Sequence, residues 1–458
     1  MTRRAAAWTA LILATAGVGG LAACASGARG GARGGYAGTA RLFDASSVYR
    51  GMGFLVGGTG LPFVAAVRYL AGPGPDSTLA LFSLSLTNHS ITFQRAGSEF
   101  VAEYHVEASF RAESGSVVPV RQIGRDAEVR VRSFQETMRT DESVIFQQFV
   151  TLPPGAYRVQ VAVRDRNGPA FARAERLDTV PRFATSGSTR PIAIYSGSGR
   201  DARAALPELL ANPRATLSYG ADSVFFYIEA YGQPPNAHLL ARVVDERDRE
   251  LWRDTVPLAG SPQLAAGRVA VAPATLPVGR AELETTPLAG GDTARAGFLV
   301  SFSTQWVITS YEELTSLLRY FARQEWIDSL RQAAPEARPD VWKAFWRETD
   351  PTPITPENEA LDGYFRLVQQ ANVRFQDEGE PGWLTDRGEV FITLGEPDEE
   401  VDLSTGLNRA GFRALRWAYR EYRLILIFHD QSGFGRFRLT PISRSEYLRV
   451  LARVRRSQ

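Results

Sequence analysis

The sequence predicts a multidomain protein of the β and α+β classes. We expect two tandem β-sandwiches of immunoglobulin or fibronectin type, then a helical segment and a small antiparallel α+β domain. The length of 458 residues corresponds to roughly three domains. Short apolar runs with a period of two occupy the middle of the chain, as in strands with one buried face. From Thr309 onward the apolar period is that of a helix.

The composition excludes several classes of protein. Basic and acidic residues number 52 and 50, and this net charge of +2 is too small to indicate binding to nucleic acid. Its single cysteine rules out an internal disulfide framework and a thiolate-rich metal site. The four histidines lack the spacing of metal ligands. We therefore expect no metal, no cofactor and no nucleic-acid partner. The histidines are His89, His105, His238 and His429.

Residues 1–23 have the plan of an export signal. Two arginines precede an apolar stretch that ends near Val18 and is too short to span a bilayer. The signal runs into Leu21-Ala22-Ala23-Cys24, which resembles a bacterial lipobox. The resemblance implies cleavage before Cys24 and a diacylglyceryl group on its thiol. A plain secreted protein with an incidental cysteine is the alternative.

Residues 24–40 begin at the lipidated Cys24 and are rich in glycine, so we expect a flexible tether. Ala25 follows the cysteine, and by resemblance to the sorting rules of Gram-negative bacteria a residue other than aspartate there favours the outer membrane. The body of the chain is nearly neutral, so the acyl chains alone must anchor it. We expect an outer-membrane lipoprotein on the periplasmic face, with the lipid bilayer as a partner.

Residues 41–185 are predicted to hold a lead-in and the first β-sandwich. The lead-in, Tyr49 to Leu70, is apolar but interrupted by glycine and proline. In the last expected strand Val159, Val161 and Val163 alternate with polar residues, which predicts one buried and one wet face. The expected strands are Leu79 to Leu86, Phe100 to Arg111, Ala127 to Phe134, Ser143 to Leu152 and Tyr157 to Asp165.

Residues 190–305 are predicted to repeat the plan, because the Pro-Gly turn of Leu152 to Val159 recurs at Leu276 to Leu283. A helix from Asp201 to Leu210 after the loop Gly197-Ser198-Gly199 would have the order of a phosphate-binding loop, but Pro207 interrupts such a helix. A third glycine and a Gly-Lys-Ser/Thr sequence are missing, so we favour a plain connecting loop. The expected strands are Ile192 to Tyr195, Val224 to Ala230, Leu239 to Asp245 and Phe298 to Phe302.

Residues 306–458 are predicted to form the helical segment and the α+β domain. Ser310 and Glu313 form a capping box for a first helix, and a second is expected from Asp340 to Arg347. For a third helix we expect Thr355 as N-cap and Pro356 at the first position. The buried stripe of that helix is Leu361, Tyr364, Phe365, Val368, Asn372 and Phe375.

Gly382-Trp383-Leu384-Thr385-Asp386 follows, and we expect a strand from Glu389 to Leu394 after it. This stretch resembles the GWxTD-domain family of bacterial envelope-type proteins, and further matching positions extend the resemblance from about residue 340 to 440. The resemblance implies an architecture and no established activity. Later elements are strands at Ala414 to Arg420, Leu424 to Asp430 and Arg436 to Thr440, a hairpin turn at 431–435, and a helix from Ser445 to Val454.

Two interpretations of the motif are open. In one, Asp386 is a general acid or base or a polar clamp, with Arg387 polarising it. In the other, Trp383 plugs the core while Thr385 and Asp386 hydrogen-bond the backbone of a tight turn closed by Gly388. We favour the second. The candidate site residues are Trp383, Thr385, Asp386 and Arg387, with Glu357, Asn358, Glu359 and Asp398 beside them.

Two further groups of residues are candidates. The acidic cluster from Glu396 to Asp402 lacks the ligand pattern of a calcium loop, so we expect a solvated loop. Aromatic residues near the motif can form a face that binds glycan or protein, although strand alternation must bury about half of them. These aromatics are Trp417, Tyr419, Tyr422, Phe434 and Phe437.

We expect a non-catalytic binding or scaffold lipoprotein that meets an envelope protein or glycan through its C-terminal domain. The alternative is an envelope hydrolase that uses carboxylates around Asp386.

Overall fold

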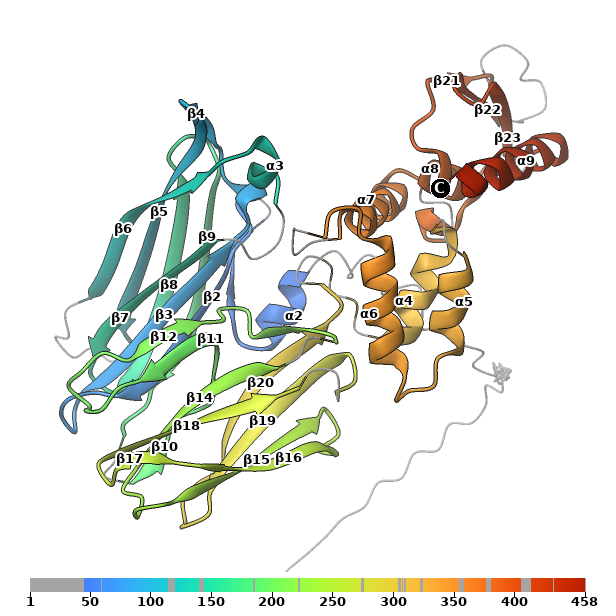
Figure 1. Cartoon of the computed structure of the whole chain (residues 1–458). Helices are drawn as coiled ribbons and strands as arrows, with labels where there is room; N and C mark the ends of the chain where they lie inside the picture. The colour runs from blue at the N-terminus through green and yellow to red at the C-terminus, as the bar shows by residue number, and fades with distance from the viewer. Residues whose placement is uncertain are drawn as a thin grey trace, which may run out of the picture.

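The computed structural model describes residues 45–58, 60–113, 120–139, 144–183, 186–220, 223–272, 276–303, 306, 308, 310–321, 324–353, 358–375, 380–404, 413–430 and 432–457. Two β-sandwiches lie together, and a helical segment connects them to a small α+β domain, as the sequence predicts (Figure 1). Within these ranges no helix is long and apolar enough to cross a membrane. The predicted signal, Cys24 and the tether lie outside the described residues.

The first sandwich packs a sheet of order β1-β2-β3-β7 against a sheet of order β4-β5-β8-β9, with β6 paired to β5. All its neighbouring strands are antiparallel. The strands are β1 (Leu55–Val56), β2 (Val64–Ala71), β3 (Thr78–Leu86), β4 (Gln94–Ala96), β5 (Glu99–Ala112), β6 (Arg121–Val131), β7 (Val144–Leu152), β8 (Gly155–Asp165) and β9 (Phe171–Val180), with helices α2 (Ala45–Gly51), η1 (Asn88–Ser90) and α3 (Phe134–Thr137).

Alternation decides which residues of β8 are buried, whereas all nine residues of β3 are buried. Val159, Val161 and Val163 on β8 are fully buried, as their spacing predicts. The prediction of a strand up to Phe134 is wrong at its end. Strand β6 stops at Val131, because Ser133 accepts a hydrogen bond from the N–H of Glu136 and starts α3.

The second sandwich has one sheet of order β12-β11-β14-β18-β17, with β10 paired to β14, and another of order β13-β20-β19-β15-β16. Strand β13 runs parallel to β20, and the other pairs are antiparallel. The strands are β10 (Gly187–Ser188), β11 (Ile192–Gly199), β12 (Glu208–Ala211), β13 (Thr216–Ser218), β14 (Val224–Tyr231), β15 (His238–Asp245), β16 (Glu250–Pro257), β17 (Ala259–Ser261), β18 (Leu264–Val271), β19 (Gly279–Pro287) and β20 (Ala294–Ser301).

Residues Asp201 to Leu210 do not form the helix that a phosphate-binding loop requires, in line with the connecting loop that we favoured. Gly197 to Gly199 continue β11, and Glu208–Ala211 return beside it as β12. Pro207 excludes a regular helix here, and pairing with β11 satisfies the backbone that a helix would have satisfied internally. The order of elements required by a phosphate-binding loop is therefore absent at this position.

A buried polar network joins the two sandwiches. Arg200 and Glu229 of the second sandwich have fully buried side chains and share two hydrogen bonds of 2.8 Å. Tyr227 and Tyr231 donate to the same carboxylate at 2.9 and 2.6 Å. Arg200 also donates to the carbonyl of Ala71 in β2 at 2.6 Å, and the Ala71 N–H donates to the Tyr231 hydroxyl at 2.8 Å. Each buried charge thus has partners, and the sandwiches are held in one orientation.

The helical segment consists of α4 (Tyr311–Leu317), η3 (Leu318–Tyr320), α5 (Gln324–Gln332), α6 (Arg338–Thr349) and α7 (Glu359–Arg374). Ser310 caps α4 by accepting from the N–H of Glu313 at 3.0 Å, as predicted. The prediction that Thr355 caps α7 is wrong, since Asn358 accepts from the N–H of Leu361 at 3.0 Å. Thr355, Pro356 and Glu357 lie outside the described residues.

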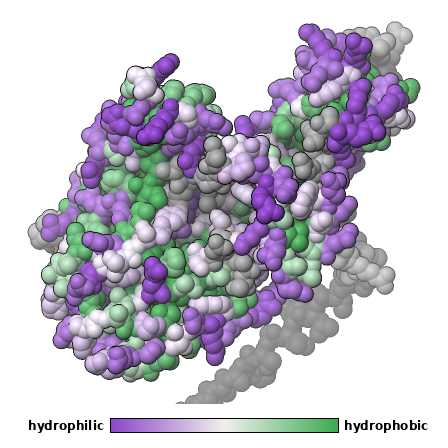
Figure 2. All heavy atoms as spheres, viewed as in Figure 1, coloured by the Kyte–Doolittle hydropathy of each residue, from purple (hydrophilic) through white to green (hydrophobic). Residues whose placement is uncertain are grey.

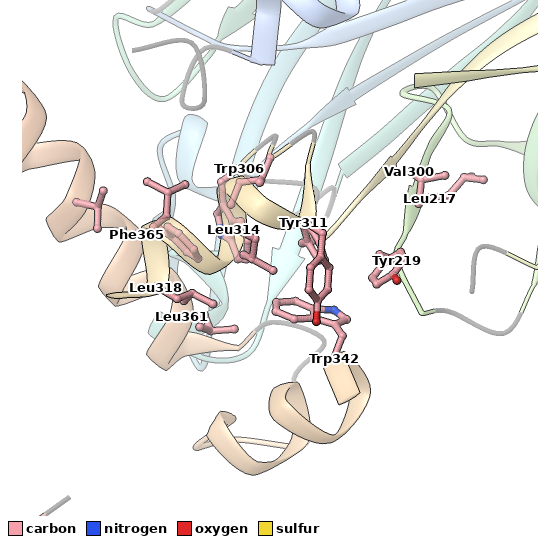
Figure 3. Close-up of a cluster of buried hydrophobic side chains, with 14 of the residues drawn as sticks. Leu217, Tyr219, Val300, Trp306, Tyr311, Leu314, Leu318, Trp342, Leu361 and Phe365 are labelled. Carbon is pink, nitrogen blue, oxygen red and sulfur yellow. The ribbon is translucent and has the colours of Figure 1, made fainter. Parts of the chain in front are cut away.

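The second sandwich and the helical segment share one hydrophobic core. Phe302, just after β20, contacts the Trp342 ring of α6 with 4.7 Å between centroids and the Tyr219 ring with 5.1 Å. Trp306 stacks on Phe365 of α7 at 4.1 Å. Figure 3 shows side chains from the sandwich strands and from the helices meeting in this cluster. The helices are therefore built onto the sandwich rather than linked to it by a free chain.

The C-terminal domain has a sheet of order β21-β22-β23-β24, with α8 and α9 packed against it. Its elements are η4 (Gly382–Leu384), α8 (Asp386–Leu394), β21 (Glu399–Asp402), β22 (Arg413–Tyr419), β23 (Leu424–Asp430), β24 (Phe437–Leu439) and α9 (Pro441–Ser457).

Two expectations for this domain are wrong. Residues Glu389 to Leu394 belong to helix α8 rather than to a strand, because Thr385 caps a helix there. Residues Glu399 to Asp402 form an edge strand on β22 rather than a loop, with Glu400 opposite Trp417. The three later strands and the final helix lie where the sequence places them, with α9 longer at both ends.

Candidate functional site

The two glycines of the motif bring three backbone segments into contact. A Cβ atom on Gly382 would lie 2.0 Å from the carbonyl oxygen of Ala371, in α7. A Cβ atom on Gly388 would lie 1.9 Å from the carbonyl oxygen of Gly382 itself. No side chain fits at either position, because real Cβ contacts are much longer. These glycines allow α7, η4 and α8 to stack directly on one another.

Trp383 fills the core under this stack. Trp383 is 2% exposed, and its backbone N–H donates to the Oδ1 atom of Asn372 in α7 at 3.1 Å. The Tyr320 ring meets the Trp383 ring edge-on, and the Arg319 guanidinium lies 5.1 Å from its centroid. Trp383 is therefore a core residue that ties the motif to α7 and η3, which is the packing role we favoured.

Thr385 starts helix α8. Its hydroxyl donates to the Gly382 carbonyl at 2.7 Å and accepts from the Gly388 N–H at 3.0 Å. It is completely buried, so these bonds satisfy both its own hydroxyl and an N–H that a helix start leaves free. The structure thus uses Thr385 as an N-cap, where we expected a tight turn before a strand.

Asp386, the next residue, joins α8 to β24 and α9. Its Oδ2 atom accepts the backbone N–H of Leu439 at 2.7 Å, and its Oδ1 atom lies 2.7 Å from the Arg444 guanidinium. Arg438 lies 3.5 Å from the same Oδ1 atom. Strand β24 lies at the edge of the sheet, so the Leu439 N–H has no neighbouring strand to bond to. The Asp386 carboxylate accepts this hydrogen bond in place of a strand. It also lies at the first position of α8, where the helix dipole favours negative charge.

The ion pairs of Asp386 continue into a small network. Arg444 also donates to Glu389 at 2.9 Å, and Arg438 donates to Glu380 at 2.8 Å. Burial alone would lower the pKa of Arg444, but the carboxylates of Glu389 and Asp386 outweigh burial and raise it. Arg444 therefore remains charged, and the network holds the start of α9 on α8.

Arg387, which the catalytic interpretation pairs with Asp386, lies against two aromatic rings. Its guanidinium lies 4.5 Å from the Phe437 ring centroid and 5.3 Å from that of Phe375. Such a geometry is a cation–π contact that covers two core aromatics. Arg387 thus packs against the sheet.

The other predicted site residues serve separate parts of the domain. Asn358 caps α7 and donates to the Trp346 carbonyl and the Thr349 hydroxyl, both at 2.9 Å. Glu359 lies in the first turn of the same helix. Asp398 is exposed and accepts from the N–H of Arg420 at 2.7 Å. Glu357 lies outside the described residues. Asn358 therefore ties the start of α7 to the end of α6, and Asp398 bonds the chain just after β22.

Sequence reasoning missed the partners of Asp386. Leu439 and Arg444 follow it by more than fifty positions, and no local pattern links them to the motif. The sequence signal that pointed toward these partners was Arg444, a basic residue near the start of the amphipathic final helix.

The aromatic candidates divide into core and surface. Trp417, Tyr419 and Phe437 are buried, at 0%, 3% and 4% exposure, and Tyr422 is half-buried. Phe434 is 75% exposed. A broad aromatic face is therefore absent from the described part of this domain, and Phe434 is the member of the group that reaches solvent.

The structure has a shallow cavity of about 310 Å³ in the first sandwich, between β4, β5 and α3, which Phe93, Phe100, Phe134 and Met138 line in part. In the described ranges no three His, Cys, Asp or Glu side chains are placed to hold a metal ion. The arrangement at the motif clamps α7, α8, β24 and α9 together.

The family model of the GWxTD domain matches residues 291–424, so the chain contains this domain. No curated protein matches the chain. Among solved structures, the chain is similar to the BSP domain of a biofilm associated protein, at 7% identity and a TM-score of 0.16, over 56% of this chain and 54% of that one. It is also similar to a mutant of Salmonella alpha-2-macroglobulin, at 11% identity and a TM-score of 0.18, over 54% of this chain and 17% of that one. The chain thus spans about half of the first protein and less than a fifth of the second.

Proposed function

We propose that this chain, in which residues 291–424 match the GWxTD domain, is a lipoprotein of the outer membrane that binds an envelope partner and performs no catalysis. The observation that carries the proposal is the bonding of Asp386. Both carboxylate oxygens are used inside the fold, one by the Leu439 N–H and the other by Arg444. The acidic residue of the motif is thus committed to structure.

A hydrolase that uses Asp386 would need a different arrangement. A general acid or base must reach the proton that it transfers, within hydrogen-bond distance of a bound substrate. The Asp386 side chain is 11% exposed, and its lone pairs already accept from groups of β24 and α9. Opening this site to a substrate would break the bonds that hold α9. The geometry therefore favours the binding function over the hydrolytic one.

The membrane anchor in this proposal rests on the sequence around Cys24. Each CH₂ group of an acyl chain contributes about 0.8 kcal/mol on entering the bilayer, so the several chains of a lipoprotein hold it there. In this proposal the Gly-rich residues after Cys24 are a tether, because about fifteen residues of a Gly-rich coil span about 20 Å on average. The first sandwich then lies close to the lipid headgroups.

Replacing Cys24 with serine tests the anchor. We expect the unaltered protein to incorporate a fatty-acid probe in cells and to fractionate with the outer membrane. Because serine carries no thiol to acylate, we expect the Cys24→Ser protein to be unlabelled and to leave the membrane fraction. An unlabelled mature protein, or a Cys24→Ser protein that stays with the membrane, would contradict the anchor.

The binding function is tested with photo-crosslinking residues at exposed positions of the C-terminal domain. Ile425, Phe434 and Ile442 are 50%, 75% and 75% exposed and lie on different elements. We expect at least one of them to yield a discrete adduct with the same envelope protein in living cells. Absence of a discrete protein adduct from all three positions would contradict a binding function of this domain.

A further inference from the structure

Helix α9 carries three exposed arginines on one side, which we call the arginine face: Arg449, Arg453 and Arg456. Residues three and four positions apart lie on the same side of a helix, so this spacing places the three guanidinium groups along about two turns. Tyr447 and Leu451 are buried and face the core. The arginine face therefore lies in water, opposite the side by which α9 packs on the domain.

The arginine face has no protein partner among the described residues. Arg444, near the start of the same helix, is paired with Glu389 and Asp386. Within the ranges that the structure describes, the three arginines of the face make no ion pair and no side-chain hydrogen bond. Helix α9 holds five arginines and one glutamate, the half-buried Glu446. A strong local positive charge thus stands on a chain whose net charge is only +2.

Stability of the fold does not account for this arrangement. The helix dipole favours positive charge in the last turn, where Arg455 and Arg456 lie. Arg449 lies more than one turn earlier, where the effect of the dipole has faded. Arg449 and Arg453 are four positions apart, and like charges at this spacing repel and destabilise a helix. Unpaired repulsive charges in an ordered helix indicate an anionic ligand.

Exposed apolar side chains lie beside the arginines. Leu448 is 50% exposed, Ala452 is exposed one turn later, and each directly precedes an arginine of the face. In the view of Figure 2, hydrophilic residues dominate the lobe of the C-terminal domain, and hydrophobic ones form small groups there. Arginines with a few apolar neighbours on one exposed helix are typical of helices that lie on the surface of a bilayer.

We propose that the arginine face of α9 binds the phosphate groups of phospholipid headgroups and is a second contact between this protein and its membrane. The inference rests on the membrane anchor proposed above and adds a surface of the folded body that meets the bilayer. Guanidinium groups bond phosphate oxygens in pairs, and a negative bilayer surface attracts each nearby arginine.

The second contact has a structural consequence. Figure 1 shows α9 apart from both sandwiches, whereas α2, the first described element after the expected tether, lies beside them. An anchor before α2 leaves the body free to turn. A contact at α9 fixes which side of the C-terminal domain faces the bilayer.

A bilayer fits the arginine face better than an acidic protein or a nucleic acid. An anchored chain meets its own bilayer at a high effective concentration, so a weak electrostatic contact is sufficient. A stable protein interface buries about 800 Å² on each partner, and two turns of one helix offer much less. Nucleic acid requires a larger positive charge than the +2 of this chain.

The test measures vesicle binding without the acyl anchor. Residues 25–458 lack the expected signal and Cys24 and retain every residue that the structure describes. We expect this chain to sediment with vesicles of equal parts phosphatidylglycerol and phosphatidylcholine, and at least tenfold less with pure phosphatidylcholine. We also expect added salt to weaken the binding, because salt screens exposed charges.

The variants remove charge from the arginine face. We expect Arg449→Gln with Arg453→Gln to reduce the affinity for the mixed vesicles by roughly tenfold or more, because each arginine near an anionic surface contributes about fivefold. Arg132→Gln with Arg280→Gln is the matched control, since both arginines are exposed and lie in the sandwiches. This control is expected to bind within about twofold of the unaltered chain. Glutamine is a good helix former, and equal melting temperatures show that the fold is intact.

Each contrary outcome has a distinct meaning. An unaltered chain that fails to bind the mixed vesicles would overturn the inference, while the acyl anchor stands or falls with the Cys24→Ser protein. Equal losses in the two double variants would overturn the role of α9. Binding to immobilised polyglutamate with none to the vesicles would overturn the lipid as the ligand.

Discussion

Replacing Gly388 with alanine is expected to destabilise the C-terminal domain by about 3 kcal/mol, because overpacking of this kind usually costs about 1–3 kcal/mol and here the clash is with backbone. The added Cβ atom would lie 1.9 Å from the Gly382 carbonyl oxygen and 3.0 Å from the Trp383 Cα atom. Neither atom can move without displacing η4 from α7. We expect the melting temperature of this part of the protein to fall by roughly 10 °C in calorimetry.

The control for this substitution lies in the neighbouring helix. A Cβ atom on Gly363, inside α7, would meet nothing within 4 Å. Gly363→Ala is therefore expected to leave the melting temperature unchanged or to raise it, since alanine is the better helix former. Equal melting temperatures for Gly388→Ala and the unaltered protein would show that the three backbone segments are not stacked as described.

Replacing Trp342 with alanine is expected to cost about 3–5 kcal/mol, the range for removal of a large buried aromatic side chain. Trp342 is 2% exposed, and its ring contacts Phe302 at 4.7 Å and Phe345 at 5.5 Å between centroids. Because Phe302 follows the last strand of the second sandwich, the loss weakens the contact between sandwich and helices. We expect the calorimetric transition to broaden or to divide in two, with the helical part melting first.

Arg347→Ala is the matched control, because this side chain is 75% exposed on the same helix. It is expected to change stability by about 0.5 kcal/mol or less. If Trp342→Ala melted in one transition at the temperature of the unaltered protein, the second sandwich and the helical segment would not share a core.

Local patterns were sufficient to predict most of the architecture. Alternation predicted β8 because its valines meet the opposite sheet, and the Ser310 cap predicted where α4 begins. Residues Glu389 to Leu394, which we predicted to be a strand, belong to helix α8. Thr385 caps this helix, and its apolar side chains pack against α7 and the sheet. The β-branched residues of that stretch favour a strand when considered alone, so tertiary packing decided its structure.

The candidate site could be predicted only in part, for a physical reason. The motif residues are close in sequence, and tryptophan and threonine are residue types that pack in a core and hydrogen-bond nearby backbone. Their local roles could therefore be predicted. The bonding of Asp386 depends on Leu439 and Arg444, which reach it through the pairing of three strands and the turn into α9. The exposure of Phe434 likewise depends on Asp430, whose carboxylate folds the loop back on itself. Long-range pairing of this kind leaves no trace in a local pattern.

The central claim is that the acidic residue of the motif stabilises the fold and does not perform chemistry. The most direct measurement compares Asp386→Asn with Asp398→Asn, an exposed carboxylate of the same domain, by thermal unfolding and by hydrogen exchange at Phe437–Leu439. We predict that Asp386→Asn loses about 2 kcal/mol, because hydrogen bonds to charged groups contribute about 1.5–3 kcal/mol each. We also predict that it exchanges faster at β24, while Asp398→Asn resembles the unaltered protein. A stable Asp386→Asn protein with unchanged exchange and abolished function would contradict the claim and point to catalysis.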